Sequence, residues 1–233
     1  MDAVRRFLFE DLDIRGAVVA LGNTWHEMSA RRDLPPAVNV LLGELAAVTA
    51  LIAGNLKTPG RITFQLRGHG LISLLLVDCD EQLRLRGTAR HRDAVPPAPT
   101  FHELLGDGQL VLTLHTNLGD PWQSIVPLVG NNLTEVFEHY LVQSEQQPAR
   151  LFLTASDDFS GGLFLQKLPD ADHKDADGWN RLLHLAATLR PAELATPVAN
   201  LLMHLFPEEN IRLFDPRPVR YHCPRDEQKV LAM

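Results

Sequence analysis

The segment from Ala37 to Lys57 constrains the fold more than any other part of the chain, because its apolar residues fall on every side of the helical wheel. The apolar positions are Val38, Val40, Leu41, Leu42, Leu45, Val48, Leu51, Ile52 and Leu56. A helix that is apolar all round is enclosed by protein and does not lie on a surface. At a rise of ~1.5 Å per residue it spans about 30 Å, the width of a small domain. The segment therefore predicts a central core helix, with Asp33 placed to cap its start.

A helix of this length and composition also fits a membrane span. The residues that interrupt the apolar run are Asn39, Glu44, Thr49 and Asn55. Polar groups near the centre of a bilayer are costly, and no second apolar stretch of this length follows. We therefore expect a buried helix and no membrane segment.

Downstream of the core helix the hydrophobic pattern changes to a period of two. Residues 61–67 alternate cleanly, residues 72–77 form an apolar run after a Gly-His-Gly turn, and residues 82–87 alternate again. Strands joined by such short turns form a meander, so we expect an antiparallel sheet. Further strands are predicted at 14–21, 110–114, 125–129, 151–154 and 163–168. The predicted fold class is α+β, with a mixed or antiparallel sheet wrapped around a central buried helix and followed by a small helical linker domain.

The chain divides into four parts on its composition. Residues 1–169 form the α+β core domain, and 170–178 (DADHKDADG) form an acidic linker without large apolar side chains. Residues 179–220 form a helical linker domain, and 221–233 follow it. Two helical stripes of the linker domain supply its apolar surface. The residues on and beside these stripes are Leu182, Leu183, Leu189, Leu201, Leu202, Leu205 and Phe206.

Composition narrows the functional classes. The formal net charge is −7 and no run of basic residues occurs, so we expect no nucleic-acid partner. The first ten residues are charged and lack the apolar core of a signal peptide, which favours a cytoplasmic location. Cys79 and Cys223, the two cysteines, give no disulfide framework. No H-E-x-x-H, G-x-S-x-G or P-loop motif is present, so we expect no enzymatic activity.

Several segments together resemble the heat-shock protein 33 family, in one register from about Arg5 to Cys223. They are RRFLFEDLDIRGAVV, NVLLGELAAVTALIAGNLK with ITFQLRGHGLISLLLV, LRGTAR at 85–90, SEQQPARLFL at 144–153 and GGLFLQKLP at 161–169. The resemblance implies a redox-regulated, ATP-independent holdase chaperone of the bacterial cytosol. Such a protein binds unfolding client proteins, prevents their aggregation under oxidative and heat stress, and forms a homodimer.

The resemblance also implies a C-terminal zinc domain that begins at about residue 221. In the family a C-x-C pair and a later C-x-x-C pair hold one zinc ion through four thiolates, and oxidation of those thiolates to disulfides releases the metal. Cys223 stands where the first of the four cysteines belongs, so it is the expected metal ligand and redox cysteine. Arg225 occupies the position of the second, and the C-x-x-C half is absent from the sequence. We expect a truncated or incomplete zinc domain, and no zinc bound by this chain.

In the family, loss of the metal destabilises the neighbouring linker and uncovers an apolar surface. The resemblance therefore assigns client binding to the seven apolar linker residues named above. Packing of the same residues on the core sheet is the alternative, and both can hold at different times. Two other functional hypotheses stay open: a protein-interaction module without chaperone action, and a hydrolase without a recognisable motif.

Overall fold

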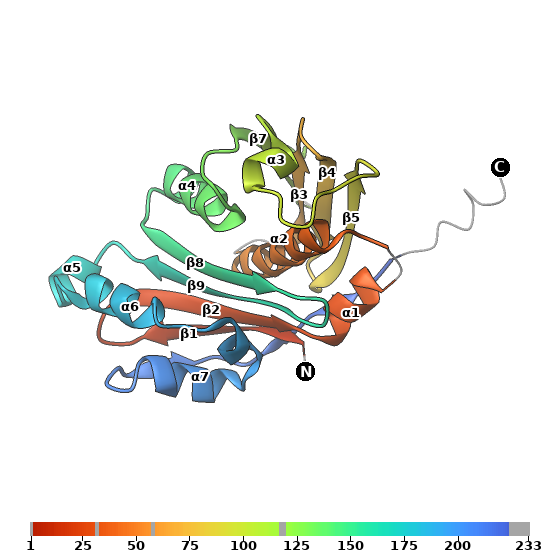
Figure 1. The fold of residues 1–233 in the computed structure, drawn as a ribbon. Coiled ribbons are helices and arrows are strands. Elements are labelled where there is room, and N and C mark those ends of the chain that lie inside the picture. The colour runs from red at the N-terminus through yellow and green to blue at the C-terminus, as the bar shows by residue number, and fades with distance from the viewer. Residues whose placement is uncertain (1, 31–32, 57–58, 117–119, 224–233) are drawn as a thin grey trace.

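Two β-sheets enclose one long helix in the computed structural model, which describes residues 2–30, 33–56, 59–116 and 120–223. The helix is α2 (Pro36–Asn55), and Figure 1 shows it between the two sheets. Each sheet has six strands. The predicted α+β class and the central buried helix are thus confirmed, although the strands form two sheets where one was expected.

The first sheet, sheet A, is built from the two ends of the chain and one middle hairpin. Its strands are β1 (Ala3–Phe9), β2 (Ile14–Leu21), β8 (Ala149–Ala155), β9 (Ser160–Lys167), β10 (Ile211–Leu213) and β11 (Arg217–Pro218). The order is β10-β1-β2-β9-β8, with β11 also pairing β1, and every pair is antiparallel. Strands from both ends of the sequence therefore meet on β1.

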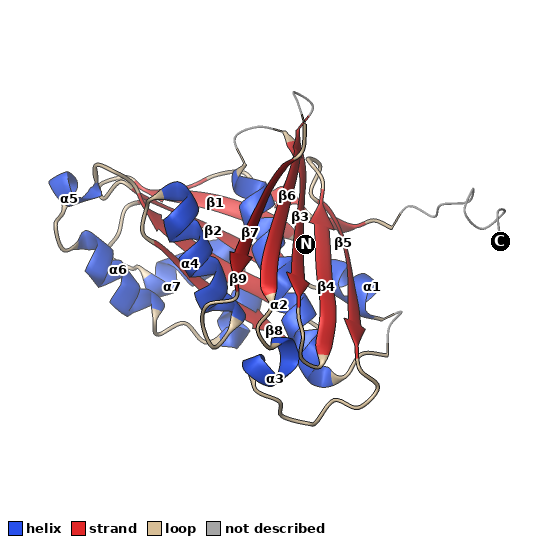
Figure 2. Cartoon of the chain, turned by 90° about the horizontal axis from the view of Figure 1, so that it is seen from above, coloured by secondary structure: helices blue, strands red, loops and turns tan. Residues whose placement is uncertain are grey.

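The second sheet, sheet B, contains the predicted meander. Its strands are β3 (Gly60–Arg67), β4 (Ile72–Cys79), β5 (Arg84–His91), β6 (Gln109–Thr116), β7 (Trp122–Pro127) and β12 (Arg220–Tyr221). The order is β12-β5-β4-β3-β6-β7, which Figure 2 shows from above. All pairs are antiparallel except β12 with β5, so the sheet is mixed.

Helix α2 has the length and hydropathy of a membrane span, but most of its apolar window is buried in the protein. Its polar groups find partners there: the Thr49 hydroxyl donates to the Leu45 carbonyl at 2.6 Å, and the Asn39 amide donates to Asp157 at 3.2 Å. The expected cap by Asp33 is wrong. The N-cap is Pro35, and no side chain caps the helix, since proline already fixes the backbone of the first turn.

The remaining helices fall into two groups. Helices α1 (Asn23–Ser29), α3 (Phe101–Leu105) and α4 (Leu133–Glu145) belong to the core domain. Helices α5 (Ala171–Lys174), α6 (Gly178–Ala186), the 3₁₀ helix η1 (Pro191–Ala195) and α7 (Val198–Leu205) belong to the linker domain. The acidic segment 170–178 is not wholly irregular, because it contains α5 and the start of α6.

Sheet A separates two hydrophobic cores, and strand β2 contributes to both. Ala17, Val19 and Leu21 face α2 in the larger core, whereas Ile14 and Val18 face the linker helices in the smaller one. Alternate side chains of a strand point to opposite faces, so a strand covered on both faces reads as a continuous apolar run. The sequence IRGAVVAL has this pattern.

Gly43 allows α2 to approach its neighbours closely. A Cβ atom there would lie 2.6 Å from the Cβ of Ala155 and 3.1 Å from the ring of Trp25. Overpacking of this kind typically costs about 1–3 kcal/mol, which exceeds the ~1 kcal/mol that alanine gains over glycine in a helix. We expect Gly43→Ala to lower the melting temperature in a thermal unfolding scan.

Gly22→Ala is the matched control, because the nearest atom to a Cβ at that position is 3.7 Å away. The control should melt close to the unmodified protein. A Gly43→Ala protein as stable as the control would contradict the close packing of α2.

Candidate functional site

The candidate site is the interface between the linker helices and the face of sheet A that points away from α2. Figure 1 shows α6 and α7 on that side of the sheet. The structure places the seven predicted client-binding residues mainly in this interface. Leu182, Leu201, Leu202, Leu205 and Phe206 are buried, and Leu183 and Leu189 are half-buried. The described structure therefore shows the covered arrangement, in which the linker packs on the core.

The sheet supplies the other half of the interface, which the sequence analysis did not name. Its residues are Phe7, Phe9, Ile14, Val18, Leu163 and Leu165. The Phe9 ring packs edge-on against Phe206 with centroids 5.1 Å apart, and against Phe7 at 5.5 Å. The signal that could have identified this face is the run at 14–21, which is apolar at odd and even positions alike.

Surface ion pairs join parts of the linker to one another, and β10 to the turn after β1. The Arg181 guanidinium donates to Glu209 and to Asp175, both at 2.9 Å, and these hydrogen bonds raise the pKa of Arg181. Arg212 on β10 pairs with Glu10. Surface ion pairs are worth at most about 1 kcal/mol each. Apolar burial therefore provides most of the free energy that holds the linker on the sheet.

A groove of about 520 Å³ follows the border between the core domain and η1. Residues from α2, α4, β8 and η1 line it, among them Glu44, Glu138, Phe152 and Leu194. Glu138 is paired with Arg150 at 2.9 Å. Glu44 is half-buried, and burial raises its pKa from the ordinary 4.5 to about 7. This carboxyl group is the one described residue at the border whose charge changes near neutral pH through burial.

The two cysteines occupy different environments. Cys79 lies on the inner face of β4 and is fully buried, as expected for a packed residue, and burial raises the pKa of its thiol. Cys223 is exposed and follows β12, beside His222. Within the described part of the chain no group of three or more His, Cys, Asp or Glu residues could hold a metal ion. The described residues therefore do not fit a four-thiolate zinc centre, and 224–233 lie outside them.

The fold and this interface define a two-sheet α+β protein in which short helices cover the outer face of sheet A. The sequence profile of the family described as Hsp33 protein matches residues 2–233. The chain belongs to this family.

Relatives across several bacteria agree with this assignment. A protein named 33 kDa chaperonin from Pseudomonas putida is 40% identical over 227 residues, which are 95% of this chain and 76% of the relative. Its namesake from Chromobacterium violaceum is 36% identical over 236 residues, covering all of this chain and 80% of the relative.

The structure of the 33 kDa chaperonin from Thermotoga maritima has the same fold. It superposes with a TM-score of 0.82 and covers 99% of this chain and 83% of that one. Sequence identity in that comparison is 20%, so it speaks for the fold alone.

Glu44 makes the stability of the protein depend on pH. A carboxyl group whose pKa is higher in the folded state than in the unfolded state stabilises the folded protein when it is protonated. For Glu44 this contribution to stability is fully present below about pH 4.5, the ordinary pKa. That contribution is lost as the pH rises through about 7. We expect Glu44→Gln to leave stability at pH 5 nearly unchanged and to raise it at pH 8, by roughly 2–3 kcal/mol at most.

Urea unfolding at both pH values measures this difference. Glu208→Gln, at an exposed position of the linker domain, is the control and should change neither value. An E44Q protein with an unaltered difference between pH 5 and pH 8 would show that Glu44 ionises normally.

Proposed function

We propose that this protein is an ATP-independent holdase chaperone, which binds unfolding client proteins and prevents their aggregation under heat and oxidative stress. The observation that carries the proposal is the apolar interface of sheet A with the linker helices in a chain of the Hsp33 family. A holdase needs an apolar surface that is hidden at rest and can be uncovered. When this interface opens, it uncovers two apolar surfaces, one on sheet A and one on the linker helices.

The linker helices are short enough to depend on the sheet for their stability. Helix α6 has 9 residues and α7 has 8, below the ~12–15 residues at which isolated helices become even marginally stable in water. Detachment from sheet A therefore also unfolds them. The unfolded linker presents its leucines as a flexible segment, and the sheet presents Phe7, Phe9 and their neighbours as a rigid surface.

Redox control is expected to differ from the pattern that the family resemblance implies. The sequence holds two cysteines, and one of them, Cys79, is buried. Arg225 stands at the position of the second cysteine of the C-x-C pair, so the four-thiolate set of the family pattern lacks at least this ligand here. We propose that opening of the linker in this chain responds to temperature and does not require oxidation.

The proposal includes a cytoplasmic location, no enzymatic activity, and unfolded proteins as partners, with a homodimer as the working form. The relatives named 33 kDa chaperonin support the client class. The alternative, an interaction module for one folded partner, differs in that it needs no covered surface to open.

Light scattering of a heat-labile client protein tests the function. We expect the chain to suppress aggregation under reducing conditions without ATP, and peroxide treatment to add little because the four-thiolate switch is incomplete. Cys223→Ser is the control variant and should protect the client equally well.

The other outcomes separate the hypotheses. Failure to protect the client, whether reduced or oxidised, would overturn the holdase function and leave the interaction module. Protection only after peroxide, lost in C223S, would overturn the claim that oxidation is not required.

Two neighbouring residues of α7 test whether the covered interface is the client surface. Leu202 is buried against sheet A, whereas Met203 is 64% exposed. Truncation of a buried leucine costs about 2–5 kcal/mol. We expect Leu202→Ala to speed hydrogen exchange in residues 178–206 and to lower the temperature at which client protection begins. Met203→Ala should change neither, and equal behaviour of the two variants would place client binding elsewhere.

A further inference from the structure

The outer face of sheet B, which points away from α2, carries a concentration of arginines in an acidic chain. The strand registers put Arg61 and Arg67 of β3 on this face with Arg84, Arg86 and Arg90 of β5. Strands β3 to β7 contain no lysine and no glutamate. No basic run occurs in the sequence, so no basic patch was expected. Only the pairing of separate strands creates this cluster.

Three of these arginines are held in place by two carboxylates. Asp78, whose side chain is 6% exposed, accepts a hydrogen bond from Arg86 Nε at 2.8 Å, with Arg61 Nε at 3.7 Å from the same oxygen. Its other oxygen accepts from the Thr63 hydroxyl at 2.8 Å. Asp78 thus fixes the Arg86 guanidinium by a hydrogen bond, whereas Arg61 makes a longer ion-pair contact with the same carboxylate.

Asp80 holds the third arginine in the same way. One of its oxygens accepts from the backbone N–H groups of Gln82 and Arg84, and the other accepts from Arg84 Nε at 2.6 Å. Burial opposes ionisation of Asp80, but these hydrogen bonds outweigh it and keep its pKa below the usual value. Both carboxylates therefore act as anchors whose oxygens are already engaged.

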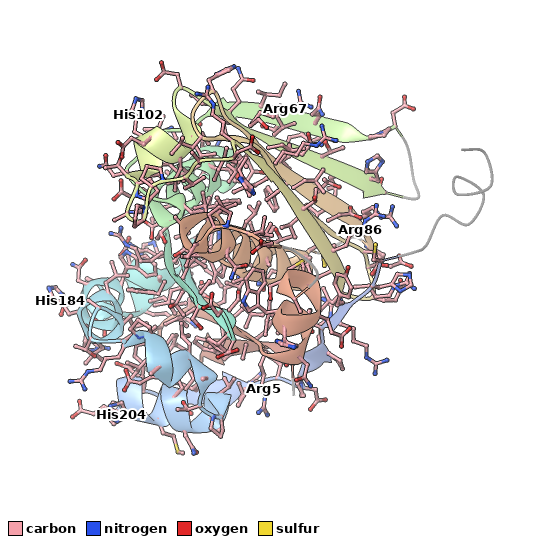
Figure 3. All side chains as sticks on the ribbon, turned by 45° about the vertical axis from the view of Figure 1, so that its right-hand side comes forward. Arg5, Arg67, Arg86, His102, His184 and His204 are labelled. Carbon is pink, nitrogen blue, oxygen red and sulfur yellow. The ribbon has the colours of Figure 1, made fainter. Side chains whose placement is uncertain are left out.

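The guanidinium groups of these arginines have terminal N–H donors that are free to bind a ligand. Within the described part of the chain, Arg61 and Arg86 engage only their Nε atoms, so their terminal nitrogens have no acceptor. Arg84 donates from one terminal nitrogen to the Gln82 side chain at 3.2 Å, which leaves its other terminal nitrogen for a ligand. The side chains of Arg61 and Arg86, with Arg84, His222 and the two anchoring carboxylates, line a hollow of about 200 Å³. A second hollow of about 360 Å³ shares Arg61, Asp80 and Arg84 with the first, and Glu81 and His115 also line it. Figure 3 shows Arg86 at the end of the sheet where β12 lies.

We propose that these hollows bind a phosphate group, or a short chain of linked phosphates, through the terminal nitrogens of Arg61, Arg84 and Arg86. Guanidinium groups pair with phosphate through parallel N–H···O bonds, and a planar, fixed fork loses little freedom on binding. Three guanidinium groups from strands β3 and β5 match a tetrahedral group with several oxygens better than a planar carboxylate. Further phosphates of a chain would lie in the second hollow, which shares Arg61 and Arg84 with the first.

Isothermal titration of the full chain with tripolyphosphate, inorganic phosphate and citrate tests the site. We expect saturable binding that is strongest for tripolyphosphate, weaker for phosphate and absent for citrate. Arg61→Gln and Arg84→Gln should each weaken tripolyphosphate binding by about tenfold or more, as expected when one charged hydrogen-bonding group is lost. Arg61→Lys keeps the charge without the fork and should recover only part of the affinity.

Arg67→Gln and Arg90→Gln are the matched controls on the same strands. Thr63 lies opposite Asp78 in the strand register and so marks the position of the site on β3. Arg67 is four residues further along β3, about 13 Å from Thr63, and Figure 3 shows it far from Arg86. The controls should bind normally. Equal weakening by all four glutamine variants would indicate diffuse attraction and overturn the site, as would tighter binding of citrate or no binding at 0.15 M salt.

Melting curves of each variant show whether it is folded, and Arg61→Gln is the most informative because its contact with Asp78 is the longest.

A single-stranded oligonucleotide provides a further titration. Binding through the same arginines would identify a nucleic-acid backbone as the source of phosphate. Binding of tripolyphosphate alone would identify free linked phosphates, and both results support the site.

Discussion

Burial of both faces of sheet A is the constraint on which the rest of the structure depends. One face of β2 and β9 packs on α2, and the other packs on the linker helices. Neither side can be left to water without exposing large apolar side chains such as Phe7, Phe9 and Leu165. The α2 side is enclosed by a helix of 20 residues and a second sheet, whereas the linker side is closed only by short helices. The two cores therefore differ in how readily they open, and the proposed function uses that difference.

Much of this architecture could be predicted because the hydrophobic pattern is local. The all-round apolar helix, the meander from β3 to β5 and the stripes of α6 and α7 all follow from spacings within one segment. Thr100 and Glu103 form the capping box of α3 through contacts three residues apart. Leu201 and Leu205, which pack on sheet A, were predicted for the same reason. An apolar stripe at helical spacing must face another apolar surface.

What could not be predicted depends on pairing between distant segments. No local pattern distinguishes one sheet from two, because strand partners are chosen across the whole chain. The arginine cluster exists only because β3, β4 and β5 align Arg61, Asp78 and Arg86 in register. The missing cap at Asp33 is a smaller case, in which a proline at the first turn made a side-chain cap unnecessary. The role of Cys223 was predicted from the family resemblance alone. Cys223 is the last residue that the structure describes.

The meeting of both chain ends on β1 has a consequence for synthesis on the ribosome. Phe7 pairs with Leu213, so one edge of β1 has no partner until a segment more than two hundred residues later has been made. Until then β1 has an open hydrogen-bonding edge and two uncovered aromatic side chains, Phe7 and Phe9. The nascent protein thus passes through a stage in which the surface it later covers is fully exposed. Synthesis of residues 178–213, after the core domain, supplies the helices and the strand that close that surface.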